Sequence, residues 1–346
     1  MKNNMVYMVH GIKVVNAMWN AAFTKNAKQN SEGLMYGSPQ ALGYAIKDQL
    51  ERDGYNILYK KMVDETGVMD LKGCFESKMG IVGQDKFKDK KFNTENNIKS
   101  ILLNNFEDVI NFGTVFTAKP YKTFGIHGAM QIGFGVNKYS ETEELISEML
   151  PCFSAENGKD KVKAEDTKNK TNDNAEKNEN ENETEEEKLK SNTLGEQYIL
   201  DKAHFLYDTT LNPFQYSNLI GVVPGFEGYK EDNYQRFKLA SIRAVSNLNS
   251  KSKKGCTNEF AMFVETKDDV RDTIDLNCLS DYINVSEKED GTVIYDLSNL
   301  ASLLNDVKED IKSIEIFYDD RLMCLIGEIE NAEYFNIKTR RKINKK

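Results

Sequence analysis

The chain has 346 residues, a formal net charge of −9, only three histidines, and five scattered cysteines without a CxxC pair. No run of 18 apolar residues occurs, so the sequence predicts no membrane-spanning helix, and its cysteines and histidines predict neither a zinc site nor a disulfide framework. We therefore expect one large domain or two, in the reducing cytoplasm, with no metal and no cofactor.

Charge is distributed unevenly along the chain, and its distribution is more informative than its sum. Residues 155–190 carry twelve acidic residues against eight lysines, so this stretch alone contributes four of the nine excess negative charges. Positive charge gathers in residues 86–91, 251–254 and 338–346. The net charge therefore excludes no class of partner, and the clusters favour a polyanion.

The N-terminal part predicts a strand followed by a loop. Residues 5–15 alternate loosely and are rich in Val, Ile and Tyr, which is typical of a central strand. Residues 16–28 form a polar loop that contains Phe23 and Trp19, the only tryptophan. Two interpretations stay open for these rings: Trp19 covers the core, or one of the two rings stacks on a nucleic-acid base.

The clearest helix signal begins at residue 38, where Ser38 suits the N-cap and Pro39 the first helical position. The spacing predicts a helix over residues 39–52 that Gly54 terminates. The side predicted to face the core carries Leu42, Ala45, Ile46 and Gln49. The other side carries Gln40, Tyr44 and Lys47.

Residues 59–107 consist of short pieces that alternate with Gly and Lys, which predicts an irregular subdomain inserted between core elements and ending in a helix near 97–107. Its lysine cluster at 86–91 is either a solvated loop or a polyanion contact. Asp64, Glu65 and Asp70 lie close together in sequence, but no neighbouring residue completes a metal or acid–base site.

Residues 108–139 hold two apolar strand candidates, 109–117 and 126–136, separated by a basic turn. Glycines at 125, 128, 133 and 135 fall within or beside the second candidate. Glycine weakens a strand unless another backbone or a ligand comes close. The stretch is therefore either a bulged hairpin packed in a core or a sheet surface left bare for a polymer backbone.

Residues 141–149 predict a short acidic helix. Residues 157–192 are Asn, Glu, Lys and Thr of low complexity, with too few apolar side chains to offset chain entropy, so we expect disorder there. Strand-like segments resume at 197–200 and 203–207. We expect the disordered stretch to form the tip of a long hairpin.

The C-terminal half predicts a second helix over 229–247, with Phe237, Ala240 and Ala244 facing inward. The loop at 247–255 combines Ser, Asn, Lys and Gly, a composition suited to phosphate groups. Further expected elements are a strand at 259–265, a helix at 297–307 and a hairpin of strands 311–318 and 322–329. The resulting order of strand, helix, strand, strand, helix, strand is ferredoxin-like, so the expected fold class is α+β.

Sequence motifs for catalysis are missing. The sequence contains no GxxxxGK[ST], GxGxxG, GxSxG or HExxH pattern. His10, His127 and His204 each lie in an apolar strand segment, where a histidine is more often a core or edge residue than a general base. No convincing catalytic set results.

Several blocks, in order along most of the chain, resemble a known family. Residues 108–116 resemble a D-x-R-x-F-G block with Ile110 at the basic position, and residues 126–135 resemble a T-G-P-V-Q-F-x-x-G block. The loop 16–20 resembles an N-P-N loop without its proline, residues 194–207 a returning thumb strand, and residues 247–255 a Ser/Arg-rich loop. Together they resemble the CRISPR-associated Cascade backbone subunit (the Cas seven family), of the type I-B kind that includes DevR.

The resemblance implies a right-hand shape with a ferredoxin-like, RRM-like palm. The palm would comprise residues 1–58, 108–136 and 199–337, the inserted fingers 59–107, and the thumb hairpin 137–198, followed by a basic tail at 338–346. It also implies a homo-oligomer that polymerises as a helical filament along a guide RNA (crRNA), together with other Cascade subunits. The guide would pair with target DNA, while the protein contacts backbone and shape and does not read bases.

Candidate RNA-binding residues follow from residue type and from the resemblance. Phosphate contacts are expected from Lys25, Lys28, Lys47, Lys251, Lys253 and Lys254. Hydrogen bonds are expected from Asn20, Gln40, Ser250 and Ser252, close backbone approach at Gly133 and Gly135, and a base wedge at Met130 or Phe134. The remaining candidates are Asn16, Trp19, Tyr44 and Arg243. This expectation requires Lys251–Lys254 and Gly133–Gly135 to share one face.

Two alternatives stay open. The first is a CRISPR-type endoribonuclease that cleaves RNA with a histidine or a loop aspartate, for which Asp64 and Asp70 are the nearest candidates. The second is a regulatory or scaffold protein that binds no RNA.

Overall fold

The structure is a computed structural model that describes residues 1–65, 67–82, 93–149, 195–268 and 274–343. The lysine cluster at 86–91 and the acidic low-complexity stretch at 157–192 lie outside the described residues, as do the last three residues of the basic tail. In the part of the chain that is described, no helix has the length and apolarity needed to cross a membrane.

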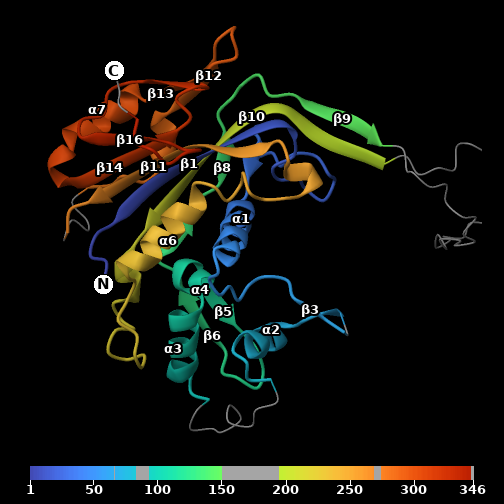
Figure 1. Ribbon diagram of the computed structural model, residues 1–346, viewed down its shortest axis with the longest axis vertical. Coiled ribbons are helices and arrows are strands. Elements are labelled where there is room, and N and C mark those ends of the chain that lie inside the picture. The colour runs from blue at the N-terminus through green and yellow to red at the C-terminus, as the bar shows by residue number, and fades with distance from the viewer. Residues whose placement is uncertain (66, 83–92, 150–194, 269–273, 344–346) are drawn as a thin grey trace, which may run out of the picture.

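A nine-stranded sheet forms the centre of the molecule (Figure 1). Its middle strand is β1 (Val6–Ala17), which confirms the first predicted strand and lies antiparallel between β10 (Gly195–Leu211) and β11 (Cys256–Thr266). Beyond β11 follow β14 (Ile311–Tyr318) and β16 (Ala332–Asn336). Beyond β10 follow β7 (Met130–Ile132), β8 (Gly135–Asn137) and β9 (Glu144–Met149), with β2 (Tyr36–Gly37) paired on β8.

Two helices separate the central strands in the chain. Helix α1 (Pro39–Arg52) follows β1, and α6 (Glu231–Ser241) lies between β10 and β11. Four neighbouring strands therefore lie in the spatial order β11-β1-β10-β8, each antiparallel to the next. The molecule is a mixed α and β protein around one large mixed sheet.

Helix α1 begins and ends as the sequence predicts. The Ser38 side chain accepts a hydrogen bond from the backbone N–H of Ala41 at 3.3 Å, and Pro39 occupies the first turn. The helix ends before Gly54, whose φ of 92° is easily adopted only by glycine. Helix α6 is shorter than predicted because the buried Asn258 side chain accepts the N–H groups of Val245 and Ser246, which holds the chain in turns after the helix.

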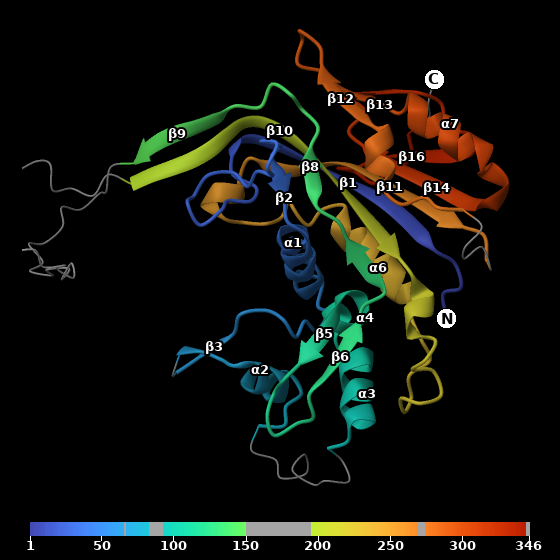
Figure 2. The ribbon, with the colours of Figure 1, turned by 180° about the vertical axis from the view of Figure 1, so that it is seen from behind.

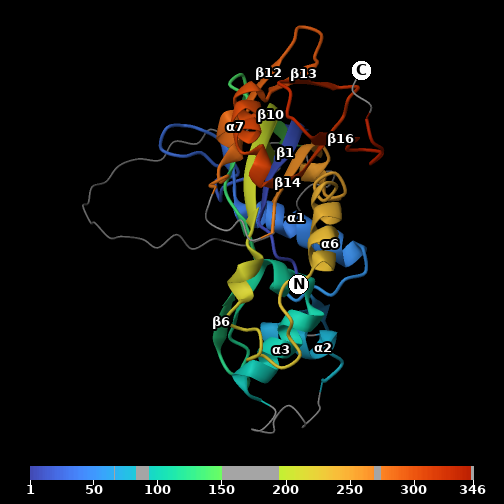
Figure 3. The ribbon, with the colours of Figure 1, turned by 90° about the vertical axis from the view of Figure 1, so that its left-hand side faces the viewer.

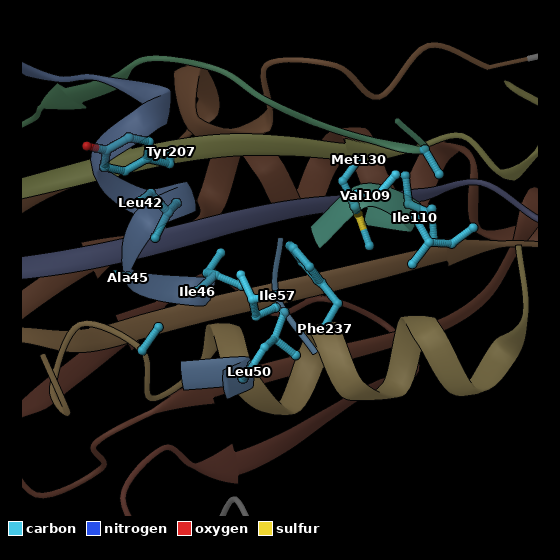
Figure 4. Packing of buried hydrophobic residues seen from close by; sticks show 14 of the residues in the cluster. Leu42, Ala45, Ile46, Leu50, Ile57, Val109, Ile110, Met130, Tyr207 and Phe237 are labelled. Atoms are coloured by element: carbon cyan, nitrogen blue, oxygen red, sulfur yellow. The ribbon is translucent and has the colours of Figure 1, made fainter. Parts of the chain in front are cut away.

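Side chains on the two faces of the sheet build two hydrophobic cores. One core joins Ile46 and Leu50 of α1 to Phe237 of α6, as Figure 4 shows. The other lies under α7 (Ser298–Asp306), a helix that confirms the prediction for 297–307. Figure 3 shows α6 and α7 on opposite sides of the sheet. Burial on both faces explains why β1 and β11 are apolar almost throughout.

The predicted hairpin over 311–329 is wrong. Strand β15 (Met323–Ile326) pairs in parallel with β13 (Val293–Asp296), which also pairs with β12 (Asn284–Glu287), so these strands form a separate three-stranded sheet. The chain leaves β14 through a turn in which the backbone carbonyl oxygen of Asp319 accepts the N–H groups of Leu322 and Met323. Met323 is buried in the second core, which favours the pairing with β13.

Below the sheet lies a lower module made of α2 (Leu71–Lys78), α3 (Glu95–Asn105), α4 (Glu107–Phe112) and two small hairpins (Figures 1 and 2). The hairpins are β3 (Val63–Asp64) with β4 (Gly67–Val68), and β5 (Gly113–Phe116) with β6 (Phe124–His127). The predicted strand 109–117 is therefore helix in its first half. Gly113, at a φ of 78°, ends that helix where an added Cβ would lie 2.2 Å from the Ile126 carbonyl oxygen.

The predicted acidic helix at 141–149 is also wrong, because this segment is strand β9. Its backbone pairs with the first six residues of β10, from Glu144 opposite Leu200 to Met149 opposite Gly195. Figure 1 shows the two strands extending together away from the rest of the sheet, and we name this pair the β9–β10 arm. Short 3-10 turns complete the fold at η3 (Pro213–Tyr216), η4 (Lys251–Lys253), η5 (Leu279–Tyr282) and η6 (Lys308–Asp310).

Candidate nucleic-acid interface

Two hollows meet at the half-exposed side chain of Tyr44 on the outer side of α1. One has a volume of about 500 Å³ and lies between α1, β7 and the lower module, where Gln40, Lys47 and Met130 line it. The other has a volume of about 430 Å³ and lies between α1 and the loop 247–255. We call the two hollows together the α1 groove.

Lys47 provides the cation of the first hollow. Its Nζ lies 5.5 Å from the ring centre of Tyr59 and 5.4 Å from that of Phe112, distances suited to cation–π contact. Burial lowers the pKa of Lys47, and the charge of Asp108 partly opposes that effect. The aromatic rings therefore hold the ammonium group in place, while the amides of Gln40 and Gln131 add hydrogen-bonding groups to the wall.

Asp108 positions the aromatic wall behind Lys47. Its carboxylate accepts the backbone N–H groups of Leu58 at 2.9 Å and Tyr59 at 2.8 Å. The Tyr59 hydroxyl in turn bonds with the hydroxyl of Thr114 and donates to the Val115 carbonyl oxygen at 3.1 Å. Burial raises the pKa of Asp108, and the two backbone donors and Lys47 act against that rise.

Lys253 in the second hollow is a structural tie, contrary to its predicted role as a phosphate contact. Its Nζ donates to the carbonyl oxygen of Met18 at 2.7 Å and also to that of Trp19. The Met18 N–H donates to the Ser252 carbonyl oxygen at 3.0 Å. Burial lowers the pKa of Lys253. These contacts fasten the loop 247–255 to the end of β1. The other polar side chains that line the hollow are those of Asn20, Asp48, Arg52, Asn249 and Ser250.

Trp19 belongs to the core, whereas stacking of Phe23 on a base stays an open alternative. The Trp19 side chain is 1% exposed, so the ring is not available for stacking on a base. The indole Nε1 donates to the Tyr207 hydroxyl at 2.6 Å, and Lys253 Nζ lies 5.6 Å from the ring centre. Asn20, the next residue, accepts the backbone N–H of Ser38 at 2.9 Å and so joins the loop to the start of α1.

The glycines at 128 and 135 support the packed-core interpretation, but residues 126–136 do not form one strand of a hairpin, because they divide into β6, β7 and β8, and β7 and β8 pair with β10. A Cβ at Gly135 would lie 2.1 Å from the Tyr207 ring, and one at Gly37 would lie 1.8 Å from its hydroxyl. Gly128 similarly faces the backbone of Phe112. The close neighbour that these glycines accommodate is the protein itself. Gly133 is exposed, and its N–H donates to the Asp208 carbonyl oxygen at 2.8 Å.

Apart from Trp19 and Asn20, the predicted residues of the loop 16–28 do not line the α1 groove. Lys28 lines a further hollow of about 350 Å³ together with Tyr36 and the fully exposed Phe23. Phe134 is exposed and lies edge-to-face on Tyr36, with ring centres 5.4 Å apart. Asn16 and Lys25 are exposed, both at positive φ. Phe134 therefore has the exposure that a base wedge needs, whereas Met130 is 2% exposed and forms part of the wall.

Arg243 does not line the α1 groove and lies beside the C-terminal end of α1. Its Nη2 donates to Asp53 at 2.6 Å and its Nε to the Leu239 carbonyl oxygen at 2.8 Å. The residue holds α6 to α1, which is a structural role. Lys251 and Lys254 are exposed on the loop 247–255.

The two predicted halves of the interface are connected through the buried side chains of Trp19 and Tyr207, and their position on one shared face stays a prediction. Lys253 lies over Trp19, Trp19 bonds to Tyr207, and Gly135 packs on the Tyr207 ring, so a continuous chain of contacts joins them. Tyr44 also borders both hollows. The sequence does not indicate Tyr59 and Phe112 as site residues, because Tyr59 lies in a stretch without periodicity and the pattern around Phe112 predicts a strand.

Comparison with known proteins identifies the family of this fold. The family model described as "CRISPR-associated protein Cas7" matches residues 4–305. The chain belongs to the Cas7 family. No curated protein matches the sequence.

Solved structures that are similar to the Cas7 chain include one from a "CRISPR RNA-guided surveillance complex". It is 10% identical, with 91% of this chain and 88% of that chain covered at a TM-score of 0.46. Another comes from a "CRISPR RNA-guided surveillance complex, pre-nicking". It is 11% identical, with 94% and 96% covered at a TM-score of 0.47.

Two aspartates and two histidines considered for RNA cleavage lie on or beside four different elements of this Cas7 protein, namely β3, α2, β6 and β10. The Asp70 carboxylate caps α2 by accepting the Gly73 N–H at 2.7 Å, and Asp64 is exposed on β3. His204 is buried with its Nδ1 2.6 Å from Glu259, whereas His127 is exposed on β6. Across the described ranges, no group of three or more His, Cys, Asp or Glu side chains is arranged to hold a metal ion.

Proposed function

We propose that this Cas7 chain is the guide-RNA-binding backbone subunit of a type I Cascade complex, of the type I-B, DevR-like kind. Copies polymerise as a helical filament on the guide RNA in the cytoplasm, together with other Cascade subunits. The guide then pairs with target DNA, and the subunit itself performs no catalysis. Membership of the Cas7 family over residues 4–305 supports this proposal.

The right-hand architecture is part of the proposal. The strands β11-β1-β10-β8 with helices α1 and α6 have the order and antiparallel pairing of a ferredoxin-like palm, assigned to residues 1–58, 108–136 and 199–337. The lower module supports fingers at 59–107, although α4, β5 and β6 belong with it in space. The β9–β10 arm supports a thumb at 137–198.

The observation that carries the proposal is the convergence of distant sequence segments on the α1 groove. Asn20 comes from the loop after β1, Tyr44 and Lys47 from α1, Met130 from β7 and Ser250 from the loop before β11. These residues are separated by up to 230 positions in the chain, yet they line two adjoining hollows. The groove is lined by amides, the half-exposed Tyr44 ring and three basic side chains against the one carboxylate of Asp48, and this composition suits a sugar–phosphate backbone; the basic residues are Lys47, Arg52 and Lys253.

The groove explains binding that does not depend on base sequence. Lys47 supplies the charge that phosphate requires, and the amide and hydroxyl groups of Asn20, Gln40 and Ser250 are of the type that contact phosphate and sugar oxygens. Lys25, Lys28, Lys251 and Lys254 would add further phosphate contacts along the same side. Such contacts fix the register of the RNA without reading its bases.

Lys47→Gln tests the proposal. RNA that co-purifies with the protein from cells expressing a CRISPR array is measured by absorbance ratio and particle size. We expect less bound RNA. The slope of log K for RNA binding against log salt concentration should also be flatter by about 0.7, because one phosphate contact to a single strand is lost. Lys312→Gln, an exposed lysine at the start of β14, is the matched control. Equal RNA content in both variants would contradict the groove assignment, and RNA-free wild-type protein would contradict the function.

A further inference from the structure

The chain ends in a short basic turn that the groove does not include. It follows β16 and is shaped by Asn336, whose side-chain oxygen accepts the backbone N–H groups of Lys338 at 3.0 Å and Thr339 at 2.9 Å. The Asn336 carbonyl oxygen accepts the Arg340 N–H at 2.6 Å, and Arg340 has a φ of 61°. The chain then returns through a bridge between Phe335 and Lys342. Residues 338–342 therefore form a fixed, projecting turn, which we call the basic turn.

The basic turn concentrates positive charge in a chain whose net charge is −9. Lys338, Arg340, Arg341 and Lys342 are all exposed. Lys342 pairs with Glu333, but within the described residues no ion pair joins the other three to a carboxylate.

Two acidic residues lie near the base of the turn. The Asp319 and Asp320 carboxylates accept the Asn336 side-chain N–H at 3.4 and 2.6 Å. They thus help to hold the residue that shapes the turn, and they are not ion-pair partners of its tip.

The sheet places the basic turn at the same end as the loop 247–255. The Ile337 N–H donates to the Tyr318 carbonyl oxygen at 2.9 Å, and Tyr318 pairs with Phe260 of β11, which starts directly after that loop. Two strand spacings and four residues of strand separate the turn from the start of β11, a distance of roughly 15 to 20 Å. Positive charge therefore lies at two places at this end of the sheet, after the edge strand β16 and before the interior strand β11.

We propose that the basic turn is a second, sequence-independent contact for the phosphate backbone of a nucleic acid. Two adjacent arginines favour phosphate, because a guanidinium group pairs with it through two parallel hydrogen bonds. The tip Lys-Thr-Arg-Arg-Lys carries no apolar side chain, whereas the core of a stable protein interface is apolar and depleted of lysine. The turn therefore suits an extended polyanion better than an acidic protein. This inference does not depend on guide-RNA binding in the α1 groove.

The test replaces the three unpaired cations together, as Lys338→Gln, Arg340→Gln and Arg341→Gln in the full-length protein. The matched control is Lys267→Gln, Lys288→Gln and Lys312→Gln, which removes the same charge from exposed positions away from the turn. Fluorescence anisotropy over a salt series measures binding of a random-sequence DNA duplex and, separately, of a single-stranded RNA. Circular dichroism checks that both proteins are folded.

We expect the turn variant to bind the duplex at least about tenfold more weakly at low salt, with a log K slope flatter by about 2 to 3, because roughly 0.9 is lost per phosphate contact. If only RNA binding weakens, with a log K slope flatter by about 2, the result supports the same phosphate contact with a single strand. If the turn and control variants bind both probes equally, the proposal is wrong. The proposal would also be overturned if the turn variant no longer co-purified with another Cascade subunit while both titrations stayed unchanged. That result would indicate an acidic protein partner. Guide RNA that co-purifies should be retained, which separates this test from that of Lys47→Gln.

Discussion

His10 gives the protein an acid sensitivity that can be calculated from its surroundings. The residue lies in the middle of β1 with a fully buried ring, and neither ring nitrogen has a hydrogen-bond partner in the described part of the chain. The rings of Phe237 and Phe263 pack edge-on against it, with centres 6.3 and 5.8 Å away. Burial without a polar partner lowers the pKa of His10 to about 4.

The sign of the effect follows from proton binding. As the pH falls below 6.5, the histidine of the unfolded chain takes up a proton, while the folded protein takes one up only near pH 4. Acid therefore favours the unfolded state throughout this interval, and the stability present above pH 6.5 is progressively lost. With 1.36 kcal/mol per pKa unit, the loss is about 2 kcal/mol at pH 5 and about 3 kcal/mol at pH 4.

His10→Leu removes this proton linkage while nearly preserving side-chain volume. We expect equal or greater stability at neutral pH, because two buried, unpaired polar atoms are removed. At pH 5 the variant should exceed wild type by about 2 kcal/mol more than it does at neutral pH. Urea unfolding at the two pH values measures this difference. Met8→Leu alters the same face of β1 but keeps His10, so it should retain the wild-type pH dependence. Parallel acid destabilisation of wild type and His10→Leu would refute the reasoning.

Three further predictions concern the groove and its support. Gly135→Ala should lower the unfolding free energy by about 2 kcal/mol or more in a urea titration, because its Cβ would overlap the Tyr207 ring. Gly133→Ala should change the unfolding free energy little, because the atom nearest to its Cβ would be 3.4 Å away. Tyr207→Phe should destabilise the protein by about 1 to 2 kcal/mol, measured by thermal unfolding, because it leaves the buried Trp19 N–H without its acceptor. Asp70→Asn removes the carboxylate charge but keeps the α2 cap. Labelled target RNA should stay uncut with magnesium in both the variant and the wild type. Discrete cuts by the wild type that the variant does not make would support the nuclease hypothesis.

Local chemistry predicted the elements whose boundaries depend on nearby residues. Helix α1 starts at Ser38-Pro39 because the cap and the first turn are adjacent in sequence, and β1 is apolar because both of its faces are buried. The segment 141–149 was mispredicted because its structure depends on a partner about fifty residues away. Glu144 pairs opposite Leu200, and nothing in the local pattern encodes that pairing.

The candidate site was predictable where a helix face determined it. Gln40, Tyr44 and Lys47 share the outer side of α1, so the core-facing positions of the same helix were enough to identify them. Lys253 was assigned correctly to a loop, but its residue type did not reveal that backbone carbonyls would take its ammonium group. A lysine that binds phosphate and one that binds backbone look alike in sequence.

Tyr207 connects these outcomes, because one buried ring determines the surroundings of both glycine-rich strands and the tryptophan loop. Its ring occupies the space that Gly37 and Gly135 leave, and its hydroxyl accepts the indole N–H of Trp19. Trp19 in turn lies under Lys253, which fastens the loop 247–255 to the end of β1. Trp19, which lines the α1 groove, is thus held in place by the protein itself, so the proposed RNA binding would not have to order it. Preorganisation of this kind lowers the entropic cost of association. If the groove binds guide RNA as we propose, this preorganisation would favour binding even though the net charge of the protein is negative.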